Sequence, residues 1–304
     1  MPFKFRLGEL TLFSFSFPAS VCTLHFTKMS TNLLYPSPPY DSFAGGVEVI
    51  SIRSHPVDGA FPVIERIPEA IRYVPAAYDR HYVDLRGTFA GYLGKFSSKT
   101  RSTLQRKVRK CAEMGGGTVD WREYRSGDEL REFHRLARLV SAKTYQERLL
   151  DSGLPQSEQF VEGVVARGIA GTARGYLLFL SGEPIAYIYC PITDGTLFYD
   201  YVGFDPDHGK SSPGTVLQYL VLEKLFAEGG FKLFDFTEGE GSHKELFATH
   251  AVPCADIYFF RPTIRNALLV RLHHLLDTIS TKIVSFLDRV GLKAKLKKLL
   301  RKHA

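Results

Sequence analysis

The spacing of apolar positions predicts alternating helices and strands through the middle of the chain. Over 96–117 and 126–150 apolar residues recur at helical intervals, and Ser126 with Glu129 forms a capping box at the start of the second helix. A further helix is expected over 157–169. Strands are expected where β-branched and aromatic residues gather between turn residues. These predicted strands are 47–52, 80–85, 118–124, 175–192 (a hairpin), 196–204, 231–236 and 255–260.

The order of elements after residue 160 indicates the fold class. A helix precedes three meandering strands, and then a helix, a strand, a short helix and a last strand follow. Strands that meander pair antiparallel, whereas strands joined through a helix pair in parallel. The sequence therefore predicts an α/β protein whose mixed sheet has antiparallel and parallel parts.

The two ends of the chain are less regular. The first 26 residues superficially resemble a signal peptide, but Glu9 interrupts the apolar run and no small-residue cleavage site follows, so a strand or an over-long start before Met29 is favoured. At the other end a basic amphipathic helix is expected, which can lie on an anionic membrane or pack on its own domain. The sequence leaves both open. Its apolar positions include Leu268, Leu272, Leu275, Leu276, Ile279, Ile283 and Leu287.

Composition and charge narrow the class of protein. Hydrophobic residues make up 44% of the chain and charged residues 23%, as in a globular protein with a full core, and no apolar run reaches membrane-spanning length. The net charge is +7, but residues 265–304 alone hold ten Lys or Arg against two Asp, a net +8, which leaves −1 for the rest. This distribution disfavours nucleic acid as a partner of the rest of the chain. Four widely spaced cysteines predict reduced thiols in a cytoplasmic protein and no metal site.

The stretch GKSSPGT, residues 209–215, stands directly before a long apolar helix. A nucleotide-binding Walker motif is excluded because position 204 is Phe instead of Gly. Ser212 suits the helix N-cap, Pro213 suits the first turn, and Gly214 lets a ligand approach the backbone. Bare amides and the helix dipole at such a start favour an anion, although an ordinary cap without a ligand explains the same pattern.

Residues 175–250 resemble the GNAT-like acetyltransferase domain first associated with bacterial cellulose and exopolysaccharide biosynthesis. The resemblance rests on a hairpin reading SGEPIAY, a strand ending in YDYVGFDP, Ser212-Pro213-Gly214 opening a helix, Asp235 in a strand, and a glycine-containing loop that ends at Lys244. The basic helix over 101–110 is similar to that family's upstream helix. Two departures stand out: His243 replaces the family's usual Tyr, and the common Q/RxxGxG/A pyrophosphate signature is absent.

The resemblance implies a GNAT-like mixed sheet with helices on both faces, in two GNAT-like lobes of which the first is degenerate. It also implies acyl transfer from acyl-CoA, such as acetyl-CoA, to an amine or hydroxyl of a sugar or other small acceptor. The expected parts are an N-terminal segment and linker over 1–46, a degenerate lobe over 47–160, an acyl-CoA-binding lobe over 161–263, and a basic helical tail over 264–304.

Candidate site residues follow from this resemblance and from residue chemistry. The expected cofactor-binding residues are Ser211, Ser212, Gly214 and Thr215. A catalytic base contributes about 10²–10⁴-fold to such reactions, and Asp235, Glu238, Glu240 and His243 are the candidates near the loop. Lys244 can pair with Asp235, either catalytically or to brace the loop, and Tyr201 or Tyr199, expected on one strand face, can protonate the leaving thiolate.

Two other functions remain open on the same sequence. A transferase of this fold can use charged tRNA instead of CoA, with the basic helix over 101–110 on the RNA. A non-catalytic protein that docks on membranes through its tail is the other alternative. The acceptor and the acyl length have no signature in the sequence.

Overall fold

The computed structural model describes residues 2–7, 10–23, 43–58, 62–75, 77–144, 147, 153–239 and 241–289. The chain forms two compact units: a terminal unit of residues 1–80 and 252–304, and a central unit of residues 81–251. Strands β7 (Ala77–Asp84) and β14 (His250–Phe260) carry the chain from one unit to the other. The boundary expected at 160 lies inside the central unit, because strands and helices on both sides of it share one core.

The sheet of the central unit is mixed, as the sequence predicts. Strand β11 runs parallel to β13, and the other neighbouring pairs of the unit are antiparallel. In order across the sheet the strands are β7, β13 (Leu233–Asp235), β11 (Thr196–Phe198), β10 (Glu183–Thr193), β9 (Ala173–Leu180) and β8 (Trp121–Tyr124).

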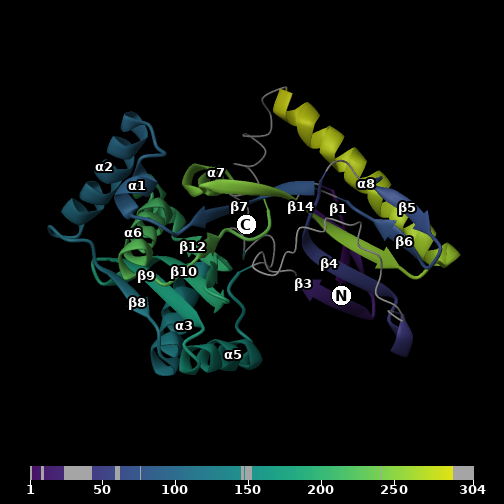
Figure 1. The fold of residues 1–304 in the computed structure, drawn as a ribbon, viewed down its shortest axis with the longest axis horizontal. Coiled ribbons are helices and arrows are strands. Elements are labelled where there is room, and N and C mark those ends of the chain that lie inside the picture. Colours follow the sequence, from purple (N-terminus) through teal and green to yellow (C-terminus); the bar gives the residue numbers. More distant parts are fainter. Residues whose placement is uncertain are drawn as a thin grey trace. The chain divides into compact units, whose positions relative to one another are not determined.

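Helices cover both faces of this sheet (Figure 1). Successive residues of β10 point to opposite faces, so Ile188 packs in one core and Tyr187 and Tyr189 pack in the other. On the Ile188 face lie α1 (Phe89–Leu93), α2 (Ser98–Met114) and α6 (Pro213–Glu228), and on the tyrosine face lie α3 (Gly127–Ser141) and α5 (Glu158–Ile169).

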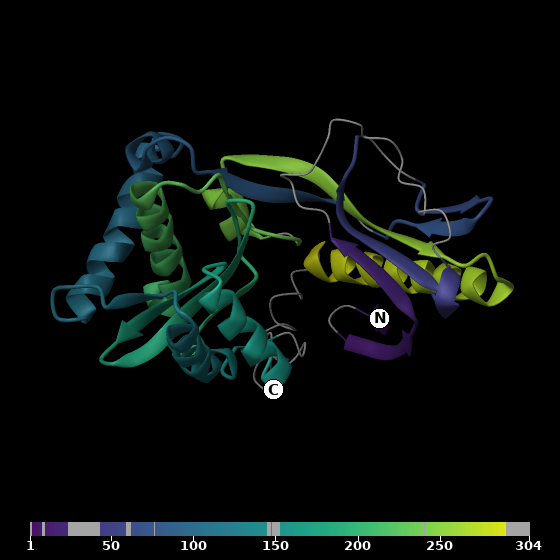
Figure 2. The same ribbon diagram turned by 60° about the horizontal axis from the view of Figure 1, so that its bottom comes forward.

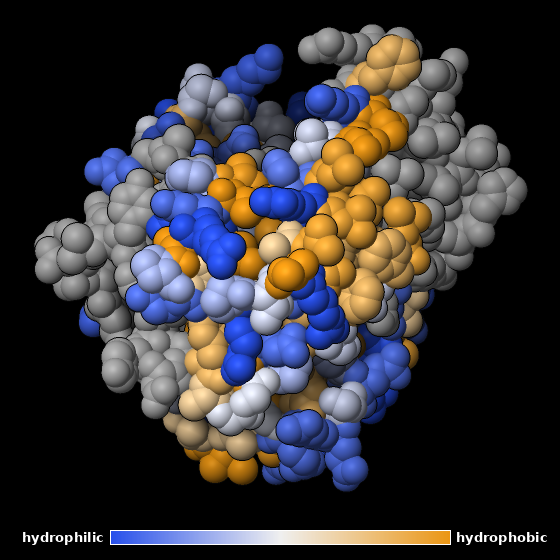
Figure 3. Space-filling model, turned by 90° about the vertical axis from the view of Figure 1, so that its right-hand side faces the viewer, coloured by the Kyte–Doolittle hydropathy of each residue, from blue (hydrophilic) through white to orange (hydrophobic). Residues whose placement is uncertain are grey.

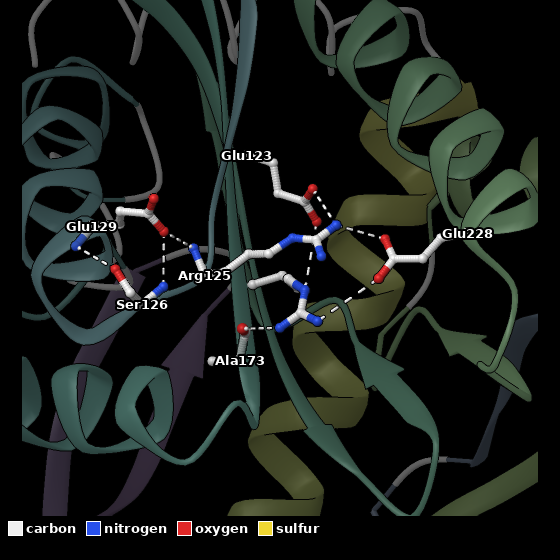
Figure 4. Close-up of polar contacts among 7 residues, drawn as sticks. Glu123, Arg125, Ser126, Glu129, Ala173 and Glu228 are labelled. Atoms are coloured by element: carbon white, nitrogen blue, oxygen red, sulfur yellow. Dashed lines mark hydrogen bonds and ion pairs between the residues drawn. The ribbon is translucent and has the colours of Figure 1, made fainter.

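The predicted capping box at the start of α3 is present (Figure 4). Ser126 accepts from the Glu129 amide, and the Glu129 carboxylate accepts from the Ser126 amide at 2.8 Å. Arg125, beside the cap, bridges Glu123 on β8 and Glu228 at the end of α6, which joins three elements. Helix α3 ends at Ser141 instead of continuing to about residue 150, because 142–144 form a turn.

The terminal unit is built around a second group of strands, with α8 (Ile264–Arg289) running alongside them (Figure 2). The expected N-terminal strand is confirmed, since Phe3, Phe5 and Phe17 are buried with Val270 of α8. Residues 24–42 of the predicted N-terminal segment and linker, and residues 290–304 of the tail, lie outside the described residues. The strands are β1 (Pro2–Leu7), β2 (Leu10–Ser16), β3 (Ala19–Thr23), β4 (Val49–Pro56), β5 (Ile64–Ile67), β6 (Ala70–Tyr73) and β14.

Among the described helices, none has the length and apolarity that a membrane-spanning helix needs.

Candidate functional site

The strand expected over 196–204 is broken in the middle, and the break opens the sheet. Strand β11 pairs with β13 as far as Phe198 and Asp235, and the Tyr199 amide then donates to the Asp235 carbonyl at 2.8 Å. After Asp200, β12 (Tyr201–Phe204) pairs with β10, while the chain beyond Asp235 turns towards β7. No described strand pairs with the other edge of β12. The two parallel strands therefore part beyond Asp235.

Helix α6 begins next to the far end of β12. A Cβ atom on Gly214 would lie 3.5 Å from the Phe204 ring, which is ordinary contact. The N-cap is Ser212, as expected, but its side chain makes no capping hydrogen bond because its backbone is left-handed, with φ 56° and ψ 50°. Pro213 has no N–H, and the amides of Gly214 and Thr215 have no partner among the described residues. The helix start thus presents uncapped amides.

Ser211, one of the four residues expected to bind the donor, lies before the start of α6 and uses its hydroxyl within its own turn. It ends the 3-10 helix η3 (Pro206–Ser211), and its hydroxyl donates to the His208 carbonyl at 2.7 Å. That turn is held from below by buried Asp205, which accepts from the Asp207 amide at 3.0 Å and from Lys143 Nζ at 2.7 Å. Burial opposes ionisation of Asp205, but the Lys143 ammonium and the backbone donor outweigh it and lower its pKa.

A polar group is buried one turn further along α6. The Gln218 side chain is 1% exposed, and neither its amide oxygen nor its amide nitrogen has a partner among the described residues. A buried amide without hydrogen bonds costs about 1–3 kcal/mol. A ligand with amide groups is one way to satisfy it.

Cationic side chains line α2, which packs against α6 and contacts η3. Its Leu104 and Cys111 are buried, as the apolar spacing predicts. Within the described ranges its basic residues have no acidic partner. These residues are Lys99, Arg101, Arg106, Lys107, Arg109 and Lys110. Helix α2 therefore carries positive charge, not neutralised by ion pairs among the described residues, beside α6 and η3.

Asp235 and Lys244 both hold the loop that follows the opening of the sheet. The Asp235 carboxylate is completely buried and accepts from the Thr237 amide at 2.8 Å. Lys244, from α7 (Ser242–Phe247), donates to the carbonyls of Glu238 and Gly239 at 2.6 and 3.1 Å. These contacts favour the bracing alternative over a base that reaches substrate. The exposed carboxylate of Glu238 lies on this braced loop, and Glu240 lies outside the described residues.

Asp200, at the break between β11 and β12, lines a hollow of about 450 Å³ on the α5 face. Its side chain is open to solvent from this hollow, yet the surrounding protein raises the pKa of its carboxyl, and the nearby charge of Glu238 raises it further. Arg167, in the last turn of α5, lines the same hollow and acts in the opposite direction. A carboxyl with a raised pKa in a concave site has the properties of a general base.

The family that matches the chain is described as an acetyltransferase (GNAT) domain, and the match covers residues 98–245. This segment is a GNAT acetyltransferase domain. The finding confirms the family resemblance that the sequence indicated, and the matched segment includes β8 and α3. The comparison with curated protein sequences finds no match.

Solved structures also resemble the chain. The C-terminal domain of a putative lysylphosphatidylglycerol synthetase from Agrobacterium fabrum has a TM-score of 0.51 at 11% identity, over 78% of this chain and 75% of that one. L-PGS from Bacillus licheniformis has a TM-score of 0.49 at 15% identity, over 78% and 75% of the two chains. FemX has a TM-score of 0.49 at 12% identity, over 77% and 76%. At 11% identity, the first similarity shows a shared fold alone.

The two strand tyrosines of the GNAT domain lie on opposite faces of its sheet, so the expectation that they share a face is wrong. Tyr199 is buried beside Phe234 in the α6 core, whereas Tyr201 packs against Phe160 of α5. The break at Tyr199 and Asp200 removes the strict alternation of a continuous strand. Burial raises the pKa of both phenols, and the Asp200 charge adds to the effect at Tyr201. Of these two phenols, Tyr201 is the one on the side of the hollow, through its contact with Phe160, while Tyr189 lines the hollow itself.

Sequence reasoning missed Asp200, although a signal was present. It is the only carboxylate in TLFYDYVGF, an otherwise apolar and aromatic strand, which is the same reason that drew attention to Asp235. Within the parts of the chain that are described, no group of three or more His, Cys, Asp or Glu is placed to hold a metal ion.

Proposed function

We propose that the GNAT domain transfers an acyl group from acyl-CoA to an amine or hydroxyl acceptor. The observation that carries the proposal is the uncapped start of α6 beside the end of β12, where the parallel strands have parted. The amides of Gly214 and Thr215 would bind the pyrophosphate of the donor, and the dipole of α6 would add to the attraction. The cations of α2 would support the same charged group.

The rest of the donor would lie along the opening between β12 and the loop after β13. Its pantetheine arm contains two amides, and Gln218 is a buried amide that lacks a partner among the described residues. Thioester carbon and sulfur would then reach the break at Asp200. The acceptor nitrogen or oxygen attacks the carbonyl carbon, the carbon–sulfur bond breaks, and the sulfur leaves as a thiolate.

Asp200 would accept the proton that the attacking group loses. A raised pKa brings the carboxylate closer to the pH at which a base works well. Tyr201, whose raised pKa keeps it protonated, would donate a hydrogen bond or a proton to the leaving thiolate. Asp235, Lys244 and Glu238 would act by shaping the loop beside this reaction centre.

The hollow suggests a class of acceptor. Asp200 and Arg167 both line it, and Arg167 has no ion-pair partner among the described residues. An acceptor that carries an amine and an anionic group would place the amine at Asp200 and the anion at Arg167. On this basis Arg167→Gln should raise KM for amino acids or amino-sugar phosphates and leave kcat nearly unchanged.

The decisive experiment measures donor binding at the start of α6. Thr215→Asp puts a negative charge in the first turn, which stabilises a helix but repels a pyrophosphate. We expect calorimetry with acetyl-CoA and longer acyl-CoAs to show at least about tenfold weaker binding with unchanged thermal stability. Glu223→Asp, at an exposed position on the same helix, is the control. Unchanged affinity in Thr215→Asp would refute this binding site.

Turnover is tested by thiol release over a panel of acyl-CoAs, with cell extract as the source of acceptors. Thiol release that depends on extract and disappears in Asp200→Asn supports acyl transfer. If the wild type binds no acyl-CoA and releases no thiol, the proposed function is wrong.

One observation favours a second function. The cations of α2, which have no acidic partner among the described residues, fit the backbone of a nucleic acid as well as a CoA phosphate. In a transferase that uses aminoacyl-tRNA, binding of tRNA would weaken steeply with salt and would be reduced in Arg106→Gln/Arg109→Gln. Acyl-CoA turnover without tRNA binding excludes this alternative.

A further inference from the structure

Helix α8 carries a second apolar face that the terminal unit does not cover. One side of the helix packs on the strands through Val270, Ala267 and Leu276. A different side exposes large apolar residues, each with 40–83% of its surface accessible. They are Ile264, Leu268, Leu272, Leu275, Ile279, Ile283 and Phe286. Soluble proteins rarely leave such a continuous apolar area open to water, so the face needs an occupant.

The exposed residues form a straight stripe. Their spacing is four, four, three, four, four and three residues, which keeps them within an arc of about 100° on a helix of 3.6 residues per turn. Figure 3 views the side that lies to the right in Figure 1, and it shows a broad apolar area there, bordered by hydrophilic residues. A stripe that runs from Ile264 to Phe286 matches a flat surface better than a compact pocket.

Strand β2 also exposes apolar residues. Leu12, Phe13 and Phe15 are 47%, 40% and 37% exposed. Phe13 stacks on Phe5 at 4.4 Å, and the Phe5 ring lies 5.2 Å from the ring of His273 on α8. Strand β2 is thus anchored on the packed side of α8, and the stripe itself is formed by α8 alone.

Charge around the stripe selects among the occupants. Arg271 and Lys282 are exposed and lie at one edge of the arc, whereas exposed Asp277 lies nearly opposite its centre. Residues 290–304, which follow α8 in the sequence, contain six Lys or Arg and no Asp or Glu. Long cationic side chains at the edge of an apolar stripe place their charges at lipid headgroups while their stems stay with the chains.

We infer that the α8 stripe binds the surface of an anionic membrane. An amphipathic helix buries its apolar face about 5–10 Å deep at the headgroup boundary, and anionic lipids add attraction to the basic flank and tail. Each Lys or Arg near such a surface adds to the attraction, which salt screens. This inference is independent of the reaction proposed for the GNAT domain.

Sedimentation of the full chain with lipid vesicles tests the inference. The wild type should bind vesicles of phosphatidylglycerol and phosphatidylcholine at least about tenfold more strongly than vesicles of phosphatidylcholine alone, and 0.5 M salt should reduce that binding. Leu275→Glu places a charge in the stripe and should weaken binding about tenfold or more. Thr281→Glu adds the same charge at an exposed position on another side of α8 and should lose less than about threefold.

Three results would overturn the inference. They are absence of vesicle binding by the wild type, equal loss in Leu275→Glu and Thr281→Glu, and equal binding to neutral and anionic vesicles. Light scattering on the same samples tests whether a second copy of the chain covers the stripe instead. A wild-type dimer that does not bind vesicles and that dissociates in Leu275→Glu would assign the stripe to that second copy.

Discussion

Asp235 ends strand β13, and Asp200 lies just beyond the neighbouring strand β11; each is flanked by aromatic residues, and the two carboxylates have opposite surroundings. Asp235 is in β13, where the parallel pairing with β11 is still intact, and its carboxylate is completely buried and bonded to the Thr237 amide. Asp200 lies two residues beyond the last paired residue of β11, where the strands have parted, and its carboxylate opens into a hollow.

The difference shows how strand pairing assigns roles to identical side chains. In buried strand β13 the Asp235 carboxylate must be satisfied by the protein, because burial without partners is costly. At the point where pairing ends, the same group meets water and can meet a substrate. We therefore expect Asp200 to act on catalysis and Asp235 to act on stability, and the following predictions test that contrast.

The largest effect is expected for Asp200→Asn. Loss of the proton acceptor should lower kcat by about 10²–10⁴-fold, because a general base contributes that much. The substitution keeps the shape of the side chain, so urea unfolding should not show a less stable protein. Asp194→Asn, in the exposed turn between β10 and β11, should retain full activity in the same assay. An active Asp200→Asn enzyme would remove the assignment of the base.

The second effect is on stability. Asp235→Ala removes the acceptor of the Thr237 amide and should cost about 1–3 kcal/mol of the free energy of unfolding. Asp235→Asn keeps an acceptor oxygen and should cost less. Chemical denaturation of both variants and of Asp200→Ala measures these free energies of unfolding. Equal stability of Asp235→Ala and Asp200→Ala would contradict the contrast between the two aspartates.

The third prediction concerns pH. Because Asp200 must be ionised to accept a proton, kcat/KM should rise with pH through a pKa above the ordinary value of 3.8. Because the pKa of this carboxyl is higher in the folded than in the unfolded protein, the free energy of unfolding falls as pH rises from the ordinary to the raised pKa. Asp200→Asn should therefore gain stability relative to the wild type over that interval, which unfolding curves at pH 4 and pH 7 can measure. If the stability difference between Asp200→Asn and the wild type were the same at pH 4 and pH 7, the pKa of Asp200 would not be raised.

The smallest effect on stability is expected at the ion pair between Lys143 and Asp205, which holds the turn before α6. Lys143→Met removes one partner of buried Asp205, and since the lysine is half exposed we expect a loss of about 1 kcal/mol or less. The lowered pKa of Asp205 means that its contribution to stability is present above its ordinary pKa and is lost as pH falls through the lowered value. The loss of unfolding free energy in Lys143→Met should therefore be measurable at pH 7 and should fade in acid. An equal loss at pH 7 and in acid would contradict the prediction.

Much of the GNAT domain could be predicted from local patterns. The Ser126 capping box, the hairpin about Ser181 and Gly182, and the helix beginning at Pro213 occur where the sequence places them. Each depends on residues within one or two turns of each other, and for such features local preference is decisive. The family resemblance also depended on these short segments.

For the central unit, the sequence by itself determined the order of the strands and the long helices, the mixed sheet and the family, because periodicity and turn chemistry are local properties. Only the tertiary structure decided that the third strand breaks at Asp200, that Tyr199 and Tyr201 face opposite cores, and that Ser212 leaves the helix start uncapped. It also decided that α8 packs with one side and exposes another. These features depend on pairing between segments far apart in the chain, which no window of sequence contains.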